Sequence, residues 1–205
     1  MTIEEARNRV RLIIDREDTA YLSDIDIDGF VEMSVDEFAQ QYYLSFETSQ
    51  DSRDKLQKLV RSELIAGTKS PQVDMESAGS LDWQTPDTQF DYPYSKLLAI
   101  HYTEEPHTSV KIIQLSDLGA YSNDPFNLVN EEYPIAYEQM GYLFFRGWEG
   151  TKNLIVKYLK YTTNIEDLSL HTHEEVCQIA ARKVLATLGD PRFQILQAEI
   201  TDRRG

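Results

Sequence analysis

Residues 154–188 read LIVKYLKYTTNIEDLSLHTHEEVCQIAARKVLATL, and two different periodicities follow one another within this segment. Its first eight residues are rich in branched aliphatic and aromatic side chains, which is typical of a β-strand. After Thr172 the apolar residues recur every three or four positions, which is the spacing of an amphipathic helix. A strand followed by a strong helix predicts a mixed α+β protein.

The helical part of this segment carries its own signals for where it begins and ends. Thr172 and Glu175 have the T-x-x-E spacing of a capping box, so we expect the helix to begin at Thr172. Gly189 and Pro191 are residues that end helices. The single cysteine, Cys177, lies among the apolar residues of this helix, and we expect it to be a small buried hydrophobic residue.

The N-terminal residues also predict helices. Thr2 and Glu5 form another T-x-x-E pair ahead of a first helix. A second helix follows a break, and either Ser23 caps it or Ser34 with Glu37 caps a shorter version. Its apolar stripe consists of Ile27, Val31, Val35, Phe38, Tyr42 and Phe46. A third helix is predicted from Ser52 to Ala66, with Gly67 ending it.

The middle of the chain changes in character twice. Residues 67–93 are rich in Gly, Ser, Pro, Thr and Asp and predict a connection with one short strand near Leu81–Gln84. From Ser95 to Tyr161 short strand-like runs alternate with turns, and a short helix is predicted within Asp117–Asn127. The predicted strands are Leu97–Tyr102, Val110–Leu115, Ile135–Tyr137, Tyr142–Phe145 and Leu154–Tyr161, with hairpin turns at 105–108 and around Gly141.

These elements together predict an α+β fold. It consists of an N-terminal helical bundle, a small antiparallel β-meander and a C-terminal helix that packs back on the bundle. The predicted parts are N-terminal helices over residues 1–66, a linker over 67–94, an antiparallel β subdomain over 95–165, and a C-terminal helix and arm over 166–205. We expect the helical parts to form one bundle.

The chain of 205 residues is strongly acidic, with a net charge of −15. Residues 71–140 contain 12 Asp and Glu but only Lys96 and Lys111, which gives this part a net charge of −10. Such a surface repels phosphate backbones and argues against ordinary nucleic-acid binding. The sequence has no apolar run long enough to span a membrane and no apolar core of a signal peptide near Met1, so we expect a cytoplasmic site of synthesis.

Asp24-Ile25-Asp26-Ile27-Asp28-Gly29 begins like the calcium-binding loop of an EF-hand. That loop requires a bidentate carboxylate at its twelfth position, where this chain has Val35. The alternative interpretation is an acidic helix N-terminus, where carboxylates interact favourably with the helix dipole. We therefore predict no metal ligand here.

No arrangement of reactive residues indicates an enzyme. His171 and His173 lie two positions apart, whereas zinc-binding histidines on a helix lie four apart. No nucleophile elbow, P-loop or dinucleotide-binding glycine motif occurs. We therefore predict no catalytic residue, no cofactor and no metal, and a metal-dependent hydrolase that uses His171, His173 and nearby acids is the least favoured hypothesis.

One ordered set of segments in the second half resembles a known family. Val110–Leu115 is followed by DLGAYSNDPF at 117–126, the hairpin around Gly141, LIVKYLKY at 154–161, HEEVCQIAA at 173–181 and DPRF at 190–193. This order is similar to that of the head-to-tail connector proteins, or neck ring adaptors, of tailed bacteriophages, particularly crAss-like phages. It is more distantly similar to the tail tubular A, or gatekeeper, proteins of short-tailed phages.

The resemblance implies a non-enzymatic subunit of the virion neck, assembled in the host bacterial cytoplasm. About twelve copies would form a ring by heterologous contacts between neighbouring copies, bind the portal and downstream tail proteins, and let double-stranded DNA pass without adhering. The apolar and basic residues after Pro191 are either a tie to a neighbouring subunit or portal, or an ordinary C-terminal helix. They are Phe193, Ile195, Leu196, Ile200, Arg203 and Arg204. The alternative function is a cytoplasmic adaptor or regulatory binding protein.

Overall fold

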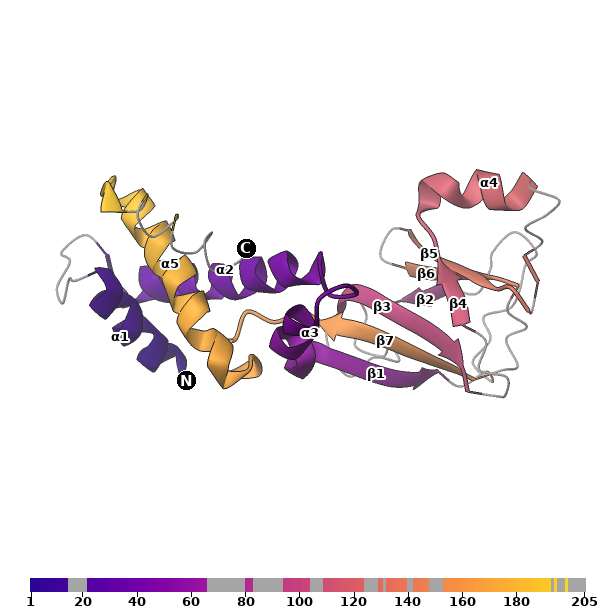
Figure 1. Cartoon of the computed structure of the whole chain (residues 1–205), viewed down its shortest axis with the longest axis horizontal. Coiled ribbons are helices and arrows are strands. Elements are labelled where there is room, and N and C mark those ends of the chain that lie inside the picture. Colours follow the sequence, from indigo (N-terminus) through magenta and orange to yellow (C-terminus); the bar gives the residue numbers. More distant parts are fainter. Residues whose placement is uncertain are drawn as a thin grey trace. The chain divides into compact units, whose positions relative to one another are not determined.

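A computed structural model describes most of the chain. The described residues are 1–14, 22–65, 80–82, 94–103, 109–123, 129–130, 132–139, 142–147, 153–192, 194 and 198. The chain folds into two compact units, one formed by Met1–Leu59 with Thr162–Gly205 and the other by Val60–Tyr161. The first unit is helical and the second contains the sheet, so the predicted α+β class is confirmed (Figure 1).

The helical unit is built around three helices, with α5 packed against both α1 and α2 (Figure 1). The C-terminal helix therefore packs back on the N-terminal helices, as predicted. The elements of this unit are α1 (Ile3–Ile14), α2 (Asp24–Tyr43), α3 (Gln50–Leu56), η1 (Gln57–Leu59), η4 (Ile165–Asp167), η5 (Leu170–Thr172) and α5 (His173–Thr187). Its fully buried core includes Val10, Ile14, Ile27, Val31, Val35, Phe38, Leu56, Ile165, Val176, Ile179 and Val184.

The predicted cap of α1 is confirmed, and of the two caps predicted for α2 the one at Ser23 is confirmed. The Glu5 amide donates to the Thr2 hydroxyl, and the Thr2 amide donates to the Glu5 carboxylate. Ser23 caps α2 in a reciprocal box with Asp26. Ser34 lies inside α2, where its hydroxyl donates to the Phe30 carbonyl, so the alternative of a shorter helix is wrong.

The third predicted helix is wrong over its second half. The helix ends at Leu56, a short 3-10 turn follows, and residues 60–65 form strand β1 (Val60–Ile65). Leu56 and Leu59 are buried in the helical unit, but Leu64 is 61% exposed. The pairing of β1 with another strand along six consecutive residues outweighs the helical spacing of these apolar residues.

The capping box predicted at the start of α5 is also wrong. The Thr172 hydroxyl donates to the Ser169 carbonyl and makes no cap hydrogen bond to α5. The Glu175 carboxylate binds two side chains of the helical unit instead. Thr172 is already in a helical conformation because η5 leads directly into α5, so it lacks the extended backbone that a capping side chain needs.

In the second unit, seven strands of the described residues form one sheet in the order β1-β7-β3-β4-β5-β6-β2. The remaining strands are β2 (Ser80–Asp82), β3 (Tyr94–Tyr102), β4 (Ser109–Ile112), β5 (Ile135–Gln139), β6 (Tyr142–Arg146) and β7 (Leu154–Lys160). The predicted pairing of β3 with β4 and the β5–β6 hairpin are confirmed. The sheet is not a simple meander, because β4 and β5 run parallel and β7 lies between β1 and β3.

Two apolar clusters stabilise this unit. The larger one draws on β3, β4, β5, β6 and β7 and is centred on Ile100, Leu143, Phe145, Val156 and Tyr158. The smaller one lies under η3 (Leu115–Asp117) and α4 (Leu118–Asn123), where Leu118 and Tyr121 pack against Ile113, Ile135 and Tyr137. The short helix predicted within residues 117–127 is thus confirmed at Leu118–Asn123.

Most of the predicted linker at residues 67–94 lies outside the described residues. Within it the structure describes β2, which pairs with β6 and corresponds to the short strand predicted near Leu81. Among the residues that are described, no helix has the length and apolar character needed to cross a membrane.

Candidate functional site

The predicted partner-binding residues cannot be placed. Phe193, Ile195, Leu196, Ile200, Arg203 and Arg204 all lie outside the described residues. The prediction that this arm binds a partner therefore remains a prediction.

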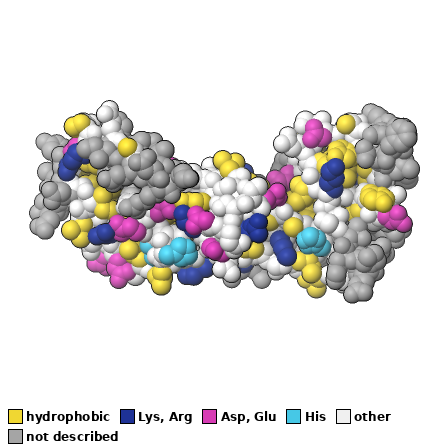
Figure 2. All heavy atoms as spheres, in the orientation of Figure 1, with side chains coloured by type: hydrophobic (Ala, Val, Ile, Leu, Met, Phe, Trp, Pro, Cys, Tyr) yellow, Lys and Arg dark blue, Asp and Glu magenta, His cyan; other side chains and the backbone are white. Residues whose placement is uncertain are grey.

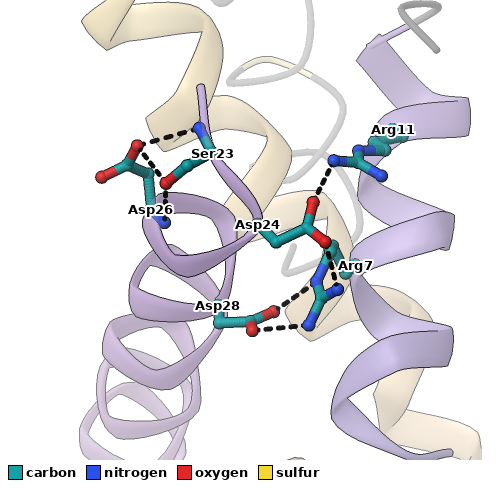
Figure 3. Close-up of polar contacts among 6 residues, drawn as sticks. All are labelled: Arg7, Arg11, Ser23, Asp24, Asp26 and Asp28. Carbon is teal, nitrogen blue, oxygen red and sulfur yellow. Dashed lines mark hydrogen bonds and ion pairs between the residues drawn. The ribbon is translucent and has the colours of Figure 1, made fainter. Parts of the chain in front are cut away.

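The calcium-loop-like sequence forms the first six residues of α2 (Figure 3). The Asp28 carboxylate accepts two hydrogen bonds from the Arg7 guanidinium, at 2.8 and 2.7 Å, and Asp24 accepts a third from Arg7 at 2.7 Å. Asp24 also pairs with Arg11, while Asp26 binds the Ser23 hydroxyl and amide. Asp24 and Asp28 share Arg7 of α1, whereas Asp26 binds Ser23 at the start of its own helix, which is the arrangement of an acidic helix N-terminus tied to a neighbouring helix.

The pKa shifts of Arg7 and Asp26 agree with a structural role for the start of α2. The hydrogen bonds to Asp28 raise the pKa of Arg7, and those from Ser23 lower the pKa of Asp26. Ser23 therefore favours the charged form of the Asp26 carboxylate. A bidentate guanidinium–carboxylate contact fixes both position and angle, so Arg7 sets the packing of α1 against α2.

The two histidines of the His171–His173 segment have separate environments. His171 is exposed in η5, whereas His173 is buried with its Nε2 3.3 Å from the Leu168 carbonyl oxygen. Burial lowers the pKa of His173, so its imidazole is held neutral in the core of the helical unit. The segment contributes packing to the start of α5, and the structure does not bring these two rings to a shared site.

A polar cluster of the helical unit joins α2, α3 and α5. The Tyr42 hydroxyl donates to the Glu175 carboxylate at 2.6 Å and accepts from the Lys55 ammonium at 2.7 Å. Lys55 also pairs with Glu175 at 3.3 Å and with Asp51 at 3.0 Å. The side chains of Lys55 and Glu175 are only 17% and 16% exposed, so their contact is largely shielded from water, whereas Asp51 lies at the exposed edge of the cluster.

The protonation of this cluster suits a structural contact better than catalysis. Burial lowers the pKa of Lys55, but the hydrogen bonds to Tyr42 and Asp51 and the charge of Glu175 outweigh it, and the net shift is upward. Burial and the bond to Glu175 raise the pKa of Tyr42. A lysine that acts as a base or nucleophile needs a lowered pKa, and the shift here has the opposite sign.

Three further ion pairs, made by two carboxylates, join α5 to the N-terminal helices. Glu37 of α2 accepts from Arg182 at 2.6 Å and from Lys183 at 2.8 Å. Glu174 accepts two hydrogen bonds from Arg9 of α1, at 2.8 and 2.7 Å. Sequence reasoning missed these contacts, because charges at helical spacing show which face they occupy but not which helix lies opposite.

Large apolar side chains remain at the surface of both units. In the helical unit Leu44 is 87% exposed and Ile25 is 81% exposed, and the described part of the sheet unit exposes Leu64 and Tyr133. Ile25, Gly29 and Met33 lie four positions apart and share one face of α2. On the face in view, hydrophobic side chains are interspersed with charged ones over the described part of the surface (Figure 2). Exposed aliphatic groups of this kind are suited to contacts with other proteins.

Known proteins provide no assignment for these features. Within the described residues, no group of three His, Cys, Asp or Glu side chains is placed to hold a metal ion. No protein-family model matches the sequence, and no curated protein matches it.

Proposed function

We propose that this chain is a structural subunit of the neck of a tailed bacteriophage virion. About twelve copies would form a ring that joins the portal to the tail and surrounds the path of the DNA. The proposal starts from the ordered segments between Val110 and Phe193 that resemble neck ring adaptors. It assigns the chain to the virion, after assembly in the host cytoplasm.

The observation that carries the proposal is the exposure of large aliphatic side chains on two units that each have a buried apolar core. Leu44 and Ile25 are more than four-fifths exposed on the helical unit, and Leu64 is 61% exposed on the sheet unit. A subunit of a cyclic ring needs two different surfaces, one for each neighbour. Separate exposed apolar groups on two units are consistent with this need.

The ion pairs within the helical unit also support the role of a rigid subunit that binds other proteins. The carboxylates of Asp28, Glu37, Glu174 and Glu175 are bound to cations of the same unit. These groups fix the relative positions of helices, which is what a rigid building block requires. The net charge of −10 in residues 71–140 favours a surface that does not adhere to passing DNA.

The proposal is tested by mixing the purified chain with the portal protein encoded by the same genome. Size-exclusion chromatography with light scattering should show a cyclic complex that contains both proteins, and electron microscopy should show its rotational symmetry. A chain that binds neither itself, the portal nor the tail proteins contradicts the proposal. A stable complex with a host protein that is absent from virions would instead support the cytoplasmic adaptor.

A further inference from the structure

Strand β1 forms an outer strand of the sheet. Its six residues pair with β7 without a register shift, whereas the pairing of β3 with β7 contains two shifts. Among the described residues, β7 is the only strand that pairs with β1. In an antiparallel pair, every second residue of a strand directs its backbone N–H and C=O groups toward the neighbouring strand. The residues of β1 that do not direct these groups toward β7 therefore direct them to the outer side of the sheet.

This strand has two charged side chains, Arg61 and Glu63, but it lacks the bulge and the proline by which many proteins protect an outer strand. Residues 60–65 read VRSELI, with no proline and no glycine. The run is regular and carries Leu64, an exposed aliphatic side chain, next to the outer edge. A regular outer strand with an apolar side chain is a template for pairing with another strand.

The sequence of β1 is complementary to itself. In an antiparallel pair of two β1 strands centred on Ser62, Arg61 of each copy lies opposite Glu63 of the other copy, and Val60 lies opposite Leu64. Arg61 and Glu63 lie opposite Tyr158 and Val156 of β7. Because directly opposite residues share a face of the sheet, both lie on the face of the larger apolar cluster. Val60, Ser62 and Leu64 lie on the other face.

Both faces of such a pair would therefore gain favourable contacts. On one face two pairs of opposite charges lie directly across from each other, and cross-strand pairs of this kind stabilise sheets. On the other face each exposed Leu64 covers Val60 of the second copy. The Glu63 carboxylate accepts a hydrogen bond from the Tyr158 hydroxyl, and Arg61 donates to the Val60 carbonyl, so both charges are already positioned above the sheet.

We propose that β1 is a self-association site, at which two copies of this chain pair antiparallel about a two-fold axis at Ser62. The site forms a continuous sheet across two copies of the free chain. It does not depend on the proposed function, because a two-fold contact is distinct from the heterologous contacts of a ring.

Two single-cysteine additions test the register. Ser62 is exposed and lies on the proposed axis, so in Ser62→Cys the two thiols face each other, whereas in Leu64→Cys they lie far apart. Cys177 is buried and does not compete. Mild oxidation of the full chain should give a covalent dimer with Ser62→Cys, little with Leu64→Cys, and efficient linkage in the Val60→Cys/Leu64→Cys double variant. Equal linkage of the first two variants would refute the register.

Charge reversal tests the same pair without any covalent bond. Arg61→Glu and Glu63→Arg each place like charges opposite each other, and each should raise the dimer dissociation constant by about tenfold. Mixing these two variants should restore a dimer that contains one of each, and the double variant Arg61→Glu/Glu63→Arg should dimerise like the wild type. The double variant also controls for loss of the Glu63 contact to Tyr158.

Light scattering of the wild-type chain alone provides the first readout. A monomer at every concentration, or a dimer that neither charge reversal weakens, would overturn the self-association site. These results are independent of binding to the portal, which is measured in a separate mixture. A dimer that forms no ring with portal would therefore contradict the proposed function while leaving the β1 site intact.

Discussion

Tyr42 and Glu175 lie 133 positions apart in the chain, and their side chains meet at a hydrogen bond of 2.6 Å. The contact joins α2, which precedes the sheet unit in the sequence, to α5, which follows it. Lys55 of α3 binds both side chains, so one cluster ties three helices together. The helical unit is thus assembled from distant segments by a shielded polar contact as well as by its apolar core.

Removing the Tyr42 hydroxyl should weaken this assembly. We expect Tyr42→Phe to lower the free energy of unfolding by about 1–2 kcal/mol, because Glu175 loses a donor and Lys55 an acceptor in a shielded site. Denaturant unfolding followed by circular dichroism measures the change. The control is Tyr161→Phe, whose ring is 46% exposed and should change stability by no more than about 0.5 kcal/mol. Equal stability of Tyr42→Phe and wild type would show that the cluster is not structural.

The pairing of Glu37 predicts a specific loss of stability in acid. Burial raises the pKa of Glu37, but the hydrogen bonds from Lys183 and Arg182 outweigh it, so the net pKa lies below the ordinary value of 4.5. The stabilisation from this pair is complete above pH 4.5 and is lost as the pH falls toward the lowered pKa of the folded state.

A glutamine substitution measures this contribution. Glu37→Gln should be less stable than the wild type near neutral pH, and the difference should shrink as the pH falls below 4.5. Glu32→Gln on the exposed side of the same helix is the matched control and should unfold like the wild type. A difference between Glu37→Gln and wild type that stays constant across this range would rule out the ion pairs as its cause.

Substitution of two glycines by alanine should change stability in opposite directions. Gly147 has a φ of 77°, and a Cβ atom there would lie 2.5 Å from the Asn130 carbonyl oxygen. Gly147→Ala should therefore destabilise the sheet unit by about 2 kcal/mol or more. Gly29 lies inside α2 with open space around it, so Gly29→Ala should stabilise the helical unit by about 1 kcal/mol. Thermal unfolding of both variants checks the pair, and similar shifts in one direction would contradict this local geometry.

Cys177 should be unreactive in the folded chain. Its side chain is fully buried, and burial raises the pKa of its thiol to about 12. A thiol reagent should modify it only after denaturation, whereas the exposed thiol of Ser62→Cys should react at once. Rapid modification of the native wild-type chain would mean that α5 does not cover Cys177 as described.

The periodic parts of the sequence predicted the fold well. The apolar stripes of α2 and α5 identify residues that are buried, such as Val31 and Val176, because a helix face reports directly on its own packing. The β5–β6 hairpin was also predictable, since its strands are close in sequence.

Contacts between distant segments were not predictable in the same way. Val60 and Leu64 have helical spacing after Leu56, yet they belong to a strand because β7, almost a hundred residues later, pairs with them. Glu175 has the spacing of a capping residue, but Tyr42 and Lys55 bind it instead. In both cases a partner that is remote in sequence outweighs a local preference. The polar cluster and the outer strand were missed for this reason.

Quantitative mass spectrometry of purified virions, made from the genome that carries this gene, tests most directly whether the chain is a neck subunit. The proposal predicts that the chain is present in a fixed ratio to the portal protein, with both forming rings at the same capsid vertex. Its absence from the virions, with the chain recovered only from the soluble fraction of the host cell, would contradict the proposal.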